Sequence, residues 1–118
     1  MNSPEKKKKD PDLELFTKFL QANSTLIADP NSSSRVRLGH TLSELGAKQN
    51  SISYAGTYDE AMAVIESRKP KLILCEFSLG NRSGLELLGE QRKQWPGSMD
   101  SVFALITGNA SQSAVASA

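Results

Sequence analysis

The sequence predicts an α/β fold in which helices cover both faces of a parallel sheet. Short apolar runs, typical of buried strands, recur along the chain, and the segments between them carry apolar residues at helical spacing. Each helical segment also has a start or stop signal, such as a capping residue, a proline or a glycine. Strands that alternate with helices in this way form a doubly wound parallel sheet through right-handed crossovers.

The first helix is expected over residues 10–22. Asp10 is a good N-cap, and Pro11 suits the first helical position. The apolar residues of this helix share one face: Leu13, Phe16, Phe19 and Leu20. That face must pack on the rest of the domain or on a partner. We expect residues 1–9, which include four lysines, to be a disordered tail, residues 10–23 to be a separate helix and residues 24–118 to be the domain.

Four strands with three intervening helices are predicted after this first helix. The strands are expected at residues 25–28, around Ile52 and Tyr54, at 72–76 and at 102–106. The helix after the first strand should take its cap from residues 32–34, end at Gly46 and turn four apolar residues inward: Val36, Leu38, Leu42 and Leu45. Capping boxes at 57–60 and 83–86 begin the other two helices, which end before Pro70 and near Trp95. The weak pattern of residues 109–118 favours one more short helix.

Composition and charge argue against several classes of protein. A net charge of +1 gives no long-range field for attracting nucleic acid, and no apolar stretch is long enough to cross a bilayer. With no signal-peptide core and one cysteine, we expect a cytoplasmic protein without an intrachain disulfide. That cysteine, Cys75, lies in an apolar strand and should be a small buried hydrophobe, whereas His40 should be exposed.

Three polar residues stand at the ends of predicted strands. Asp29 follows the first strand, Glu76 ends the third, and Thr107 follows the fourth. In open α/β sheets, functional groups gather outside the carboxyl ends of the strands. We therefore expect these three side chains to share a pocket.

Five stretches resemble the receiver domain of bacterial two-component response regulators, which has a flavodoxin-like fold. They are TLIADPNSSSR at 25–35, LSELGA at 42–47, TYDEAMAVIESRKPKLIL at 57–74, GLELL at 84–88 and ALITGNA at 104–110. The resemblance covers almost all of residues 24–118 and leaves the helix at 10–22 outside it. It implies a signalling module of a phosphorelay.

The resemblance also assigns roles by position, and two positions depart from the family. In working receivers two adjacent acids after the first strand hold magnesium, an aspartate ending the third strand accepts a phosphoryl group, and a Thr or Ser after the fourth strand senses it. Here the acid pair becomes Asp29–Pro30, the acceptor becomes Glu76 and the switch hydroxyl becomes Thr107. Gly80 stands where a proline is usual. The sequence also stops soon after the fourth strand, so the fifth strand, its helix and a sensing lysine are missing.

These departures imply no phosphorylation and weak or absent magnesium binding, so no cofactor is expected. Magnesium is usually held by one or two carboxylates plus water and phosphate oxygens, and Pro30 supplies no carboxylate. Proline also biases Asp29 toward an extended backbone. The additional methylene moves the Glu76 carboxylate about 1.5 Å beyond the reactive position. A displacement of about 1 Å can cost roughly 10²-fold in rate.

Two interpretations of Glu76 stay open at this point. In the first, its carboxylate mimics a phosphoryl group, accepts a hydrogen bond from Thr107 and holds the domain in one state. In the second, Glu76 is a retained acid in a pocket that has lost its chemistry. Neither interpretation gives Glu76 a catalytic role.

The expected function is that of a non-phosphorylatable pseudo-receiver, which is not an enzyme and acts through protein partners rather than nucleic acid or membranes. The missing last strand leaves an open sheet edge. Either the sequence is part of a longer protein, or another chain completes the sheet, for example a second copy in a homodimer. Two alternatives are a phosphorylatable receiver with an atypical acceptor and a flavodoxin-like binder of a nucleotide or flavin. Against the last, no βα turn carries a Gly-rich phosphate loop.

Overall fold

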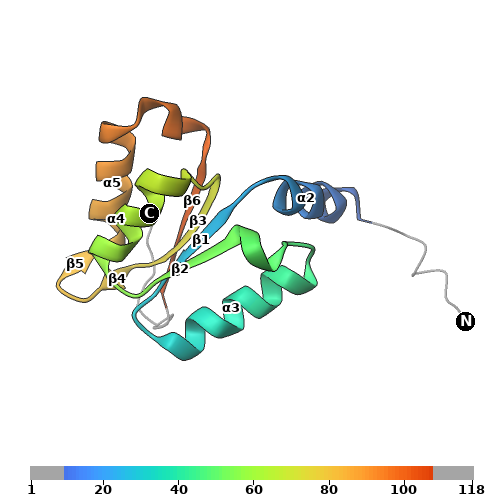
Figure 1. Ribbon diagram of the computed structural model, residues 1–118, viewed down its shortest axis with the longest axis horizontal. Helices are drawn as coiled ribbons and strands as arrows, with labels where there is room; N and C mark the ends of the chain where they lie inside the picture. Colours follow the sequence, from blue (N-terminus) through green and yellow to red (C-terminus); the bar gives the residue numbers. More distant parts are fainter. Residues whose placement is uncertain (1–9, 108–118) are drawn as a thin grey trace, which may run out of the picture.

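A computed structural model describes residues 10–107 and places a parallel sheet between helices (Figure 1). The sheet has four strands in the order β2-β1-β3-β6. These strands are β1 (Thr25–Ala28), β2 (Ile52–Ala55), β3 (Leu72–Glu76) and β6 (Val102–Ile106). The main helices are α2 (Pro11–Ala22), α3 (Ser32–Glu44), α4 (Tyr58–Arg68) and α5 (Gly84–Gln94). The predicted α/β class and the four predicted strands are confirmed. The segment 109–118 lies outside the described residues.

Four shorter elements were not predicted from the sequence. They are the 3₁₀ helices η1 (Gln49–Ser51) and η2 (Pro96–Asp100) and the antiparallel strands β4 (Ser78–Leu79) and β5 (Arg82–Ser83). The two strands form a hairpin closed by Gly80 and Asn81. Gly80 has a φ of +80°, and Asn81 is not among the non-glycine residues with positive φ, so the turn has the type II′ pattern. A proline at position 80 has its φ fixed near −65° and is excluded from this turn.

Each face of the sheet packs against its own helices, because alternate residues of a strand point to opposite faces. Figure 1 shows α4 and α5 on one side, which we call the α4/α5 face, and α3 with α2 on the other, which we call the α3 face. The α4/α5 face buries Leu26, Ala28, Ile73 and Cys75, with Phe103 and Leu105 partly buried beside them. The α3 face buries Ile27, Ile52 and Leu72 against Leu20 and Leu42, with Leu74 partly buried.

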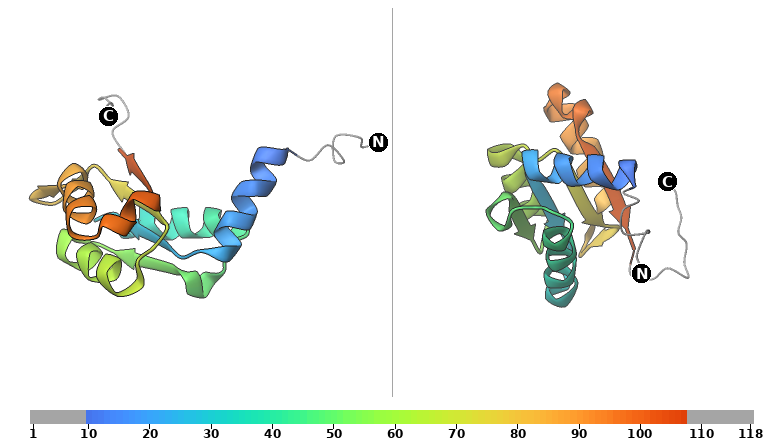
Figure 2. Two further views of the ribbon diagram at one scale, coloured as in Figure 1. Left: turned by 90° about the horizontal axis from the view of Figure 1, so that it is seen from above. Right: turned by 90° about the vertical axis from the view of Figure 1, so that its right-hand side faces the viewer.

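Helix α2 begins as predicted but packs only through its last turns. The Asp10 carboxylate accepts a hydrogen bond from the Asp12 N–H at 2.9 Å, and Pro11 is the first helical residue. Of the predicted apolar face, Leu20 is buried and Phe19 is partly buried, whereas Leu13 and Phe16 are exposed. Figure 2 shows that the N-terminal half of α2 projects away from the sheet.

Two details predicted for α3 are wrong. The N-cap is Asn31, whose side chain accepts from the Ser34 N–H at 2.9 Å, instead of a residue in 32–34. Val36 points to solvent with 69% of its surface exposed, although we expected it to face inward. The inward residues Leu38, Leu42 and Leu45 are spaced four and three apart along one side of the helix, and Val36 lies about 200° around the helix from Leu38.

Both predicted capping boxes supply only half of the predicted pattern. Thr57 and Ser83 accept hydrogen bonds from the Glu60 and Glu86 N–H groups, each at 3.1 Å. The glutamate side chains, however, do not return to the cap residue. Glu60 accepts from the Gly56 N–H at 2.7 Å, and Glu86 accepts from Arg82 at 3.0 Å. The carboxylates of Glu60 and Glu86 therefore stabilise the loops that precede α4 and α5.

Gly84 allows α5 to approach the end of β3 closely. A Cβ atom at this position would lie 2.8 Å from the Glu76 carbonyl oxygen, 2.7 Å from Leu105 Cδ2 and 3.0 Å from Cys75 Sγ. The Gly84 N–H also donates to the Phe77 carbonyl at 2.7 Å. The missing side chain thus fixes where α5 starts relative to Glu76.

We predict that Gly84→Ala lowers the free energy of unfolding by about 1–3 kcal/mol, because the new methyl group overpacks a backbone contact. Gly89 is the matched control, since it lies in the same helix with nothing near its Cβ position. Gly89→Ala should raise the free energy of unfolding by about 0.5–1 kcal/mol through helix propensity. Urea unfolding measures both, and equal effects of the two variants would contradict the packing argument.

Cys75 is buried with 0% of its surface exposed, which confirms its predicted role as a small hydrophobe. Burial raises the pKa of the Cys75 thiol to about 12, and the nearby carboxylates of Glu76 and Asp29 raise it further. The thiol therefore stays protonated in the fold at pH values where it ionises in the unfolded chain.

We predict that this thiol makes stability depend on pH in alkaline solution. The thiol's pKa is higher in the folded state than in the unfolded state, so its stabilising effect is complete below about pH 9 and is lost as pH rises toward about 12. Urea unfolding across this range should show a steeper loss of stability in the wild type than in Cys75→Ala. Parallel pH profiles would contradict the assignment.

Candidate functional site

The carboxyl ends of β1, β3 and β6 open onto a pocket of about 460 Å³. All three polar residues singled out in the sequence, Asp29, Glu76 and Thr107, line this pocket. The remaining lining residues come from the turn between β1 and α3, from the first turn of α3, and from the segment that joins β3 to the hairpin: Pro30, Asn31, Ser34, Phe77 and Ser78. The three polar residues lie together because the strands are parallel and their carboxyl ends lie at one edge of the sheet.

Asp29 is buried and organises the turn between β1 and α3. One carboxylate oxygen, Oδ1, accepts a hydrogen bond from the Asn31 N–H at 2.8 Å. Its backbone N–H donates to the Ala55 carbonyl at 2.9 Å, and its own carbonyl accepts from Arg35 Nη1 at 2.7 Å. This is an Asx-type turn, in which an aspartate holds the backbone two residues further on. One oxygen of the carboxylate thus already serves the local fold.

Pro30 takes the place of the second acid and adds no ligand. It is exposed, and it lies between Asp29 and the helix cap Asn31. Since both neighbouring side chains bond to backbone N–H groups, the turn satisfies itself without a bound ion. Among residues 10–107, no group of three or more His, Cys, Asp or Glu side chains is arranged to hold a metal ion. The residues present lack the adjacent acid pair of the magnesium site implied by the resemblance to receivers.

Glu76 and Thr107 stand at the ends of neighbouring strands. Glu76 pairs in register with Ile106 on β6, and Thr107 is the next residue along the chain. Both side chains are partly buried and both line the pocket. The pocket therefore brings two carboxylates and one hydroxyl together.

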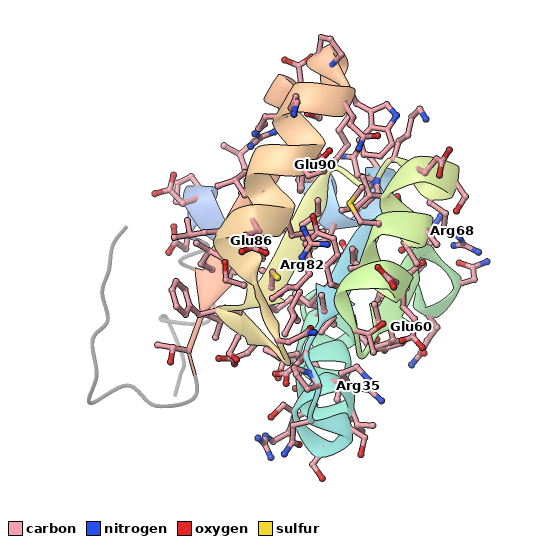
Figure 3. All side chains as sticks on the ribbon, turned by 90° about the vertical axis from the view of Figure 1, so that its left-hand side faces the viewer. Arg35, Glu60, Arg68, Arg82, Glu86 and Glu90 are labelled. Atoms are coloured by element: carbon pink, nitrogen blue, oxygen red, sulfur yellow. The ribbon has the colours of Figure 1, made fainter. Side chains whose placement is uncertain are left out.

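Arg82 is a structural contact beside the pocket that the sequence reasoning missed. Its guanidinium lies over the ring of Tyr58, 3.7 Å from the ring centre, and its Nε donates to Glu86 at 3.0 Å. Figure 3 shows Arg82 between α4 and α5. Burial raises the pKa of the Tyr58 hydroxyl, with Arg82 acting in the opposite direction. These contacts hold the hairpin, which includes the pocket residue Ser78, against helices α4 and α5.

Arg35 is a second missed residue, and it supports the turn itself. Figure 3 places it in the first turns of α3, near Glu60 of α4. Its hydrogen bond to the Asp29 carbonyl ties α3 to the end of β1.

Of the contacts made by Arg82 and Arg35, one could have been predicted from the sequence. Arg82 and Glu86 are four residues apart, the spacing of an ion pair on one face of a helix. The contacts of Arg82 with Tyr58 and of Arg35 with Asp29 depend on tertiary structure.

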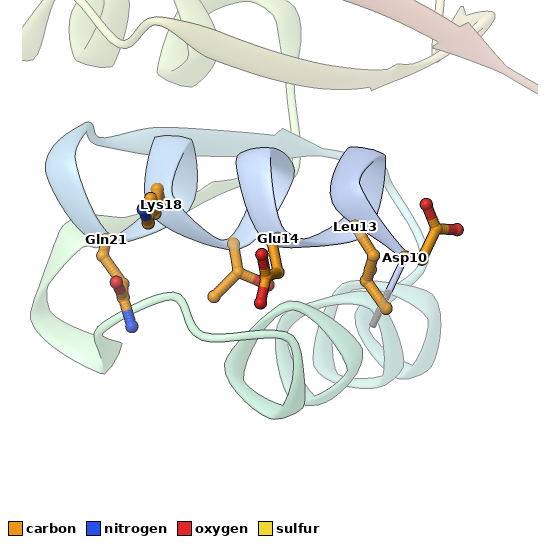
Figure 4. A pocket seen from close by; sticks show the side chains of 6 residues that line it. Asp10, Leu13, Glu14, Lys18 and Gln21 are labelled. Carbon is orange, nitrogen blue, oxygen red and sulfur yellow. The ribbon is translucent and has the colours of Figure 1, made fainter. Parts of the chain in front are cut away.

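A second groove of about 380 Å³ runs along helix α2 (Figure 4). The residues that line it come from one side of this helix: Asp10, Leu13, Glu14, Thr17, Lys18 and Gln21. Its charged residues are two acids, Asp10 and Glu14, followed by one lysine, Lys18, and no single ligand chemistry is favoured. His40, predicted to be exposed, lies on α3 with 72% of its side chain exposed, 3.8 Å from Glu44.

Within residues 10–107, no helix is both long enough and apolar enough to pass through a membrane. No protein-family model and no curated protein matches the chain.

Several solved structures do match the chain. A CheY-like response regulator receiver domain from Methylobacillus flagellatus aligns with a TM-score of 0.65 at 20% identity, over 78% of this chain and 75% of that one. The MaeR response regulator bound to beryllium trifluoride aligns with a TM-score of 0.62 at 21% identity, over 72% of this chain and 66% of that one.

NtrX from Brucella abortus, in complex with ADP, aligns with a TM-score of 0.62 at 28% identity, over 75% of this chain but 20% of that one. The receiver domain of PhyR from Erythrobacter litoralis aligns with a TM-score of 0.60 at 22% identity, over 72% of this chain and 62% of that one. The chain thus spans 62–75% of the length of these receivers, NtrX apart. These similarities establish the architecture that the sequence motifs implied. The chain has the fold of a response regulator receiver domain, here with a four-stranded sheet.

Proposed function

We propose that this chain is a non-phosphorylatable receiver-like signalling module that binds protein partners and catalyses no reaction. The observation that carries the proposal is the state of Asp29, whose Oδ1 accepts the Asn31 N–H while Pro30 replaces the neighbouring acid. Phosphoryl transfer needs a metal to neutralise charge on the transferred group. One oxygen of Asp29 is engaged and position 30 carries no acid, so the pocket lacks the adjacent acid pair that holds this metal in working receivers.

The length of Glu76 supports the same proposal. Gly84 and the β3–β6 register fix its backbone, so the additional methylene projects the carboxylate further into the pocket than an aspartate would reach. The place of a transferred phosphoryl group is then filled by the side chain itself. We infer a module of a bacterial two-component pathway, acting in the cytoplasm, whose output depends on contacts with other proteins.

The open edge of the sheet supports a protein partner. Val102 N–H donates to the Lys71 carbonyl, and the Ile106 carbonyl accepts from the Phe77 N–H, so these residues direct their backbone groups toward β3. In a parallel ladder the alternate residues, Phe103 and Leu105, direct their backbone N–H and C=O groups away from β3. Within residues 10–107, β6 is the edge strand of the sheet, and those groups lie on the side where a partner strand would pair. We expect a second copy of the chain to be one such partner.

We predict that acetyl phosphate with magnesium gives no phosphoryl adduct on the wild-type chain. The Glu76→Asp variant should give none either, because Pro30 still denies the metal an acid. Intact-mass spectrometry before and after acid treatment measures the adduct. The double variant Pro30→Asp with Glu76→Asp is the control, and its magnesium affinity should rise. An adduct on the wild type that disappears in Glu76→Ala would refute the proposal.

Magnesium binding is best followed by the amide NMR signals of Asn31, Phe77 and Ser78, which surround the pocket. Trp95 is a poor reporter because it caps the C-terminal end of α5, whereas the pocket lies near the first residue of that helix, Gly84. Eleven helical residues separate the two ends by about 16 Å.

We also propose that Glu76 and Thr107 are coupled, as a phosphoryl mimic and its switch hydroxyl. The prediction is a coupling of about 0.5–1.5 kcal/mol between Glu76→Ala and Thr107→Val in a double-mutant cycle of unfolding free energies, the range of one hydrogen bond. Glu76→Ala combined with Thr41→Val, a hydroxyl on the outside of α3, is the control and should show additivity. Additivity at Thr107 as well would leave Glu76 as a retained acid without a switch.

A further inference from the structure

The pocket at the carboxyl ends of the strands carries a local negative charge. Of the described residues that line it, two are acids, Asp29 and Glu76, and none is basic. Arg35 lies nearby, but its guanidinium bonds to the Asp29 carbonyl and Arg35 is not among these lining residues. The whole chain has a net charge of only +1, so the negative charge belongs to the pocket and not to the protein as a whole. This charge favours a cationic ligand.

Asp29 gives a second and independent reason to expect a ligand. Only 7% of its surface is exposed, and one carboxylate oxygen, Oδ1, accepts the Asn31 N–H. The other oxygen, Oδ2, has no hydrogen-bond partner within residues 10–107, and the side chain lines the pocket. A carboxylate oxygen that is removed from bulk water costs free energy unless it accepts a hydrogen bond. Oδ2 is therefore an acceptor that a ligand in the pocket can satisfy.

The acceptors favour an ammonium group over a guanidinium or a metal ion. A guanidinium binds best when both oxygens of one carboxylate are open, and Asp29 offers only Oδ2. Magnesium lacks the adjacent acid that Pro30 does not supply. An ammonium has three N–H donors that point in different directions, so it suits acceptors that come from different strands. Besides the two carboxylates, the pocket offers the hydroxyls of Ser34, Ser78 and Thr107.

Phe77 adds an aromatic wall to the same pocket. It follows Glu76 directly, lines the pocket and leaves 45% of its surface exposed. The aliphatic stem of a lysine can pack on this ring while its ammonium enters the acidic part of the pocket. An ammonium near the face of the ring gains a further attraction. A lysine side chain therefore matches both the charged and the apolar part of the pocket.

We propose that the pocket binds the ammonium group of a lysine side chain that a partner protein presents. Asp29 Oδ2 and the Glu76 carboxylate accept the ammonium hydrogens, and Phe77 packs on the methylenes. The inference rests on the proposed protein-binding role and names the chemistry of the contact. Magnesium and a free small amine are the other occupants that the test separates.

The probe is a lysine with both backbone ends blocked, Nα-acetyl-lysine N-methylamide, and its Nε-acetylated form is the neutral control. Binding to the wild-type chain is followed by the amide NMR signals of Asn31, Phe77 and Ser78. We expect the charged probe to bind with a dissociation constant of about 1–10 mM, the scale of a single side chain. The acetylated probe should cause no saturable shift.

Single variants test the named contacts. Asp29→Asn keeps an oxygen for the Asn31 N–H but removes the charge, and it should raise the dissociation constant about tenfold. Glu76→Gln should do the same, and Phe77→Leu should raise it about two- to fivefold. Glu44→Gln is the matched control, because it removes one carboxylate charge at the end of α3, about 15 Å along the helix from Ser34, and it should leave binding unchanged. The NMR spectrum of each variant establishes that it is folded.

Four results on the probe would overturn the inference: no saturable binding, equal binding of its acetylated form, unchanged binding in both Asp29→Asn and Glu76→Gln, or an equal loss in Glu44→Gln. Tighter binding of magnesium would make the pocket a metal site, and binding of 1,4-diaminobutane at least about tenfold tighter would assign it to a free amine; either overturns the inference. The acetyl phosphate assay reports separately on the proposed function. Uptake of phosphate refutes that function, whereas a chain that takes up none and does not bind the probe refutes only this inference.

Discussion

A parallel sheet is stable in water only when both of its faces are covered, and this requirement governs the whole structure. The α4/α5 face meets it within the domain, where two amphipathic helices bury Leu26, Ile73 and Cys75. The α3 face meets it in part, with α3 over one half and the last turns of α2 at its border. The position of α2 is therefore a consequence of the sheet and not an accessory to it. Without Leu20, the centre of the α3 face would lose a fully buried side chain.

The pocket keeps the location expected of a receiver site, although positions 30 and 76 carry other residue types. The strands still end together, and Asp29, Glu76 and Thr107 still line one cavity. Within that frame, each neighbouring polar group has a local structural partner. Asp29 holds Asn31, Asn31 caps α3, and Arg35 returns to the Asp29 carbonyl. Such a turn is complete without an ion, which is why we assign it a structural role and place the function of the module in its surfaces.

The sequence predicted the elements of the fold well, because periodicity and capping are local properties. The four strands, the cap at Asp10 and the burial of Cys75 all follow from neighbours within a few residues. The errors arose where a tertiary partner decides the outcome. Val36 was expected inside because it is apolar, yet the direction of α3 is set by where Leu38 and Leu42 meet the sheet. The Glu86 side chain was expected to cap its own helix, yet Arg82 holds it.

The candidate site was predictable as a location and less so as a set of contacts. The rule that strand ends gather at one edge identified three of its residues, all of which the pocket includes. The hairpin after Glu76 was not predictable from strand patterns, because its strands are two residues long and depend on the conformation of Gly80. The stacking of Arg82 on Tyr58 joins residues 24 positions apart and has no local signature.

The burial of the single cysteine also makes the chain a convenient object for spectroscopy. Cys75 is enclosed by the core, and its high pKa keeps the thiol unreactive at neutral pH. A cysteine introduced on the surface would consequently be the one thiol that accepts a spin label or fluorophore in the folded protein. Labels placed on α2 and on β6 would report the distance between this helix and the sheet directly, without first removing a native residue. Because Cys75 is buried, surface positions can be labelled selectively through introduced cysteines.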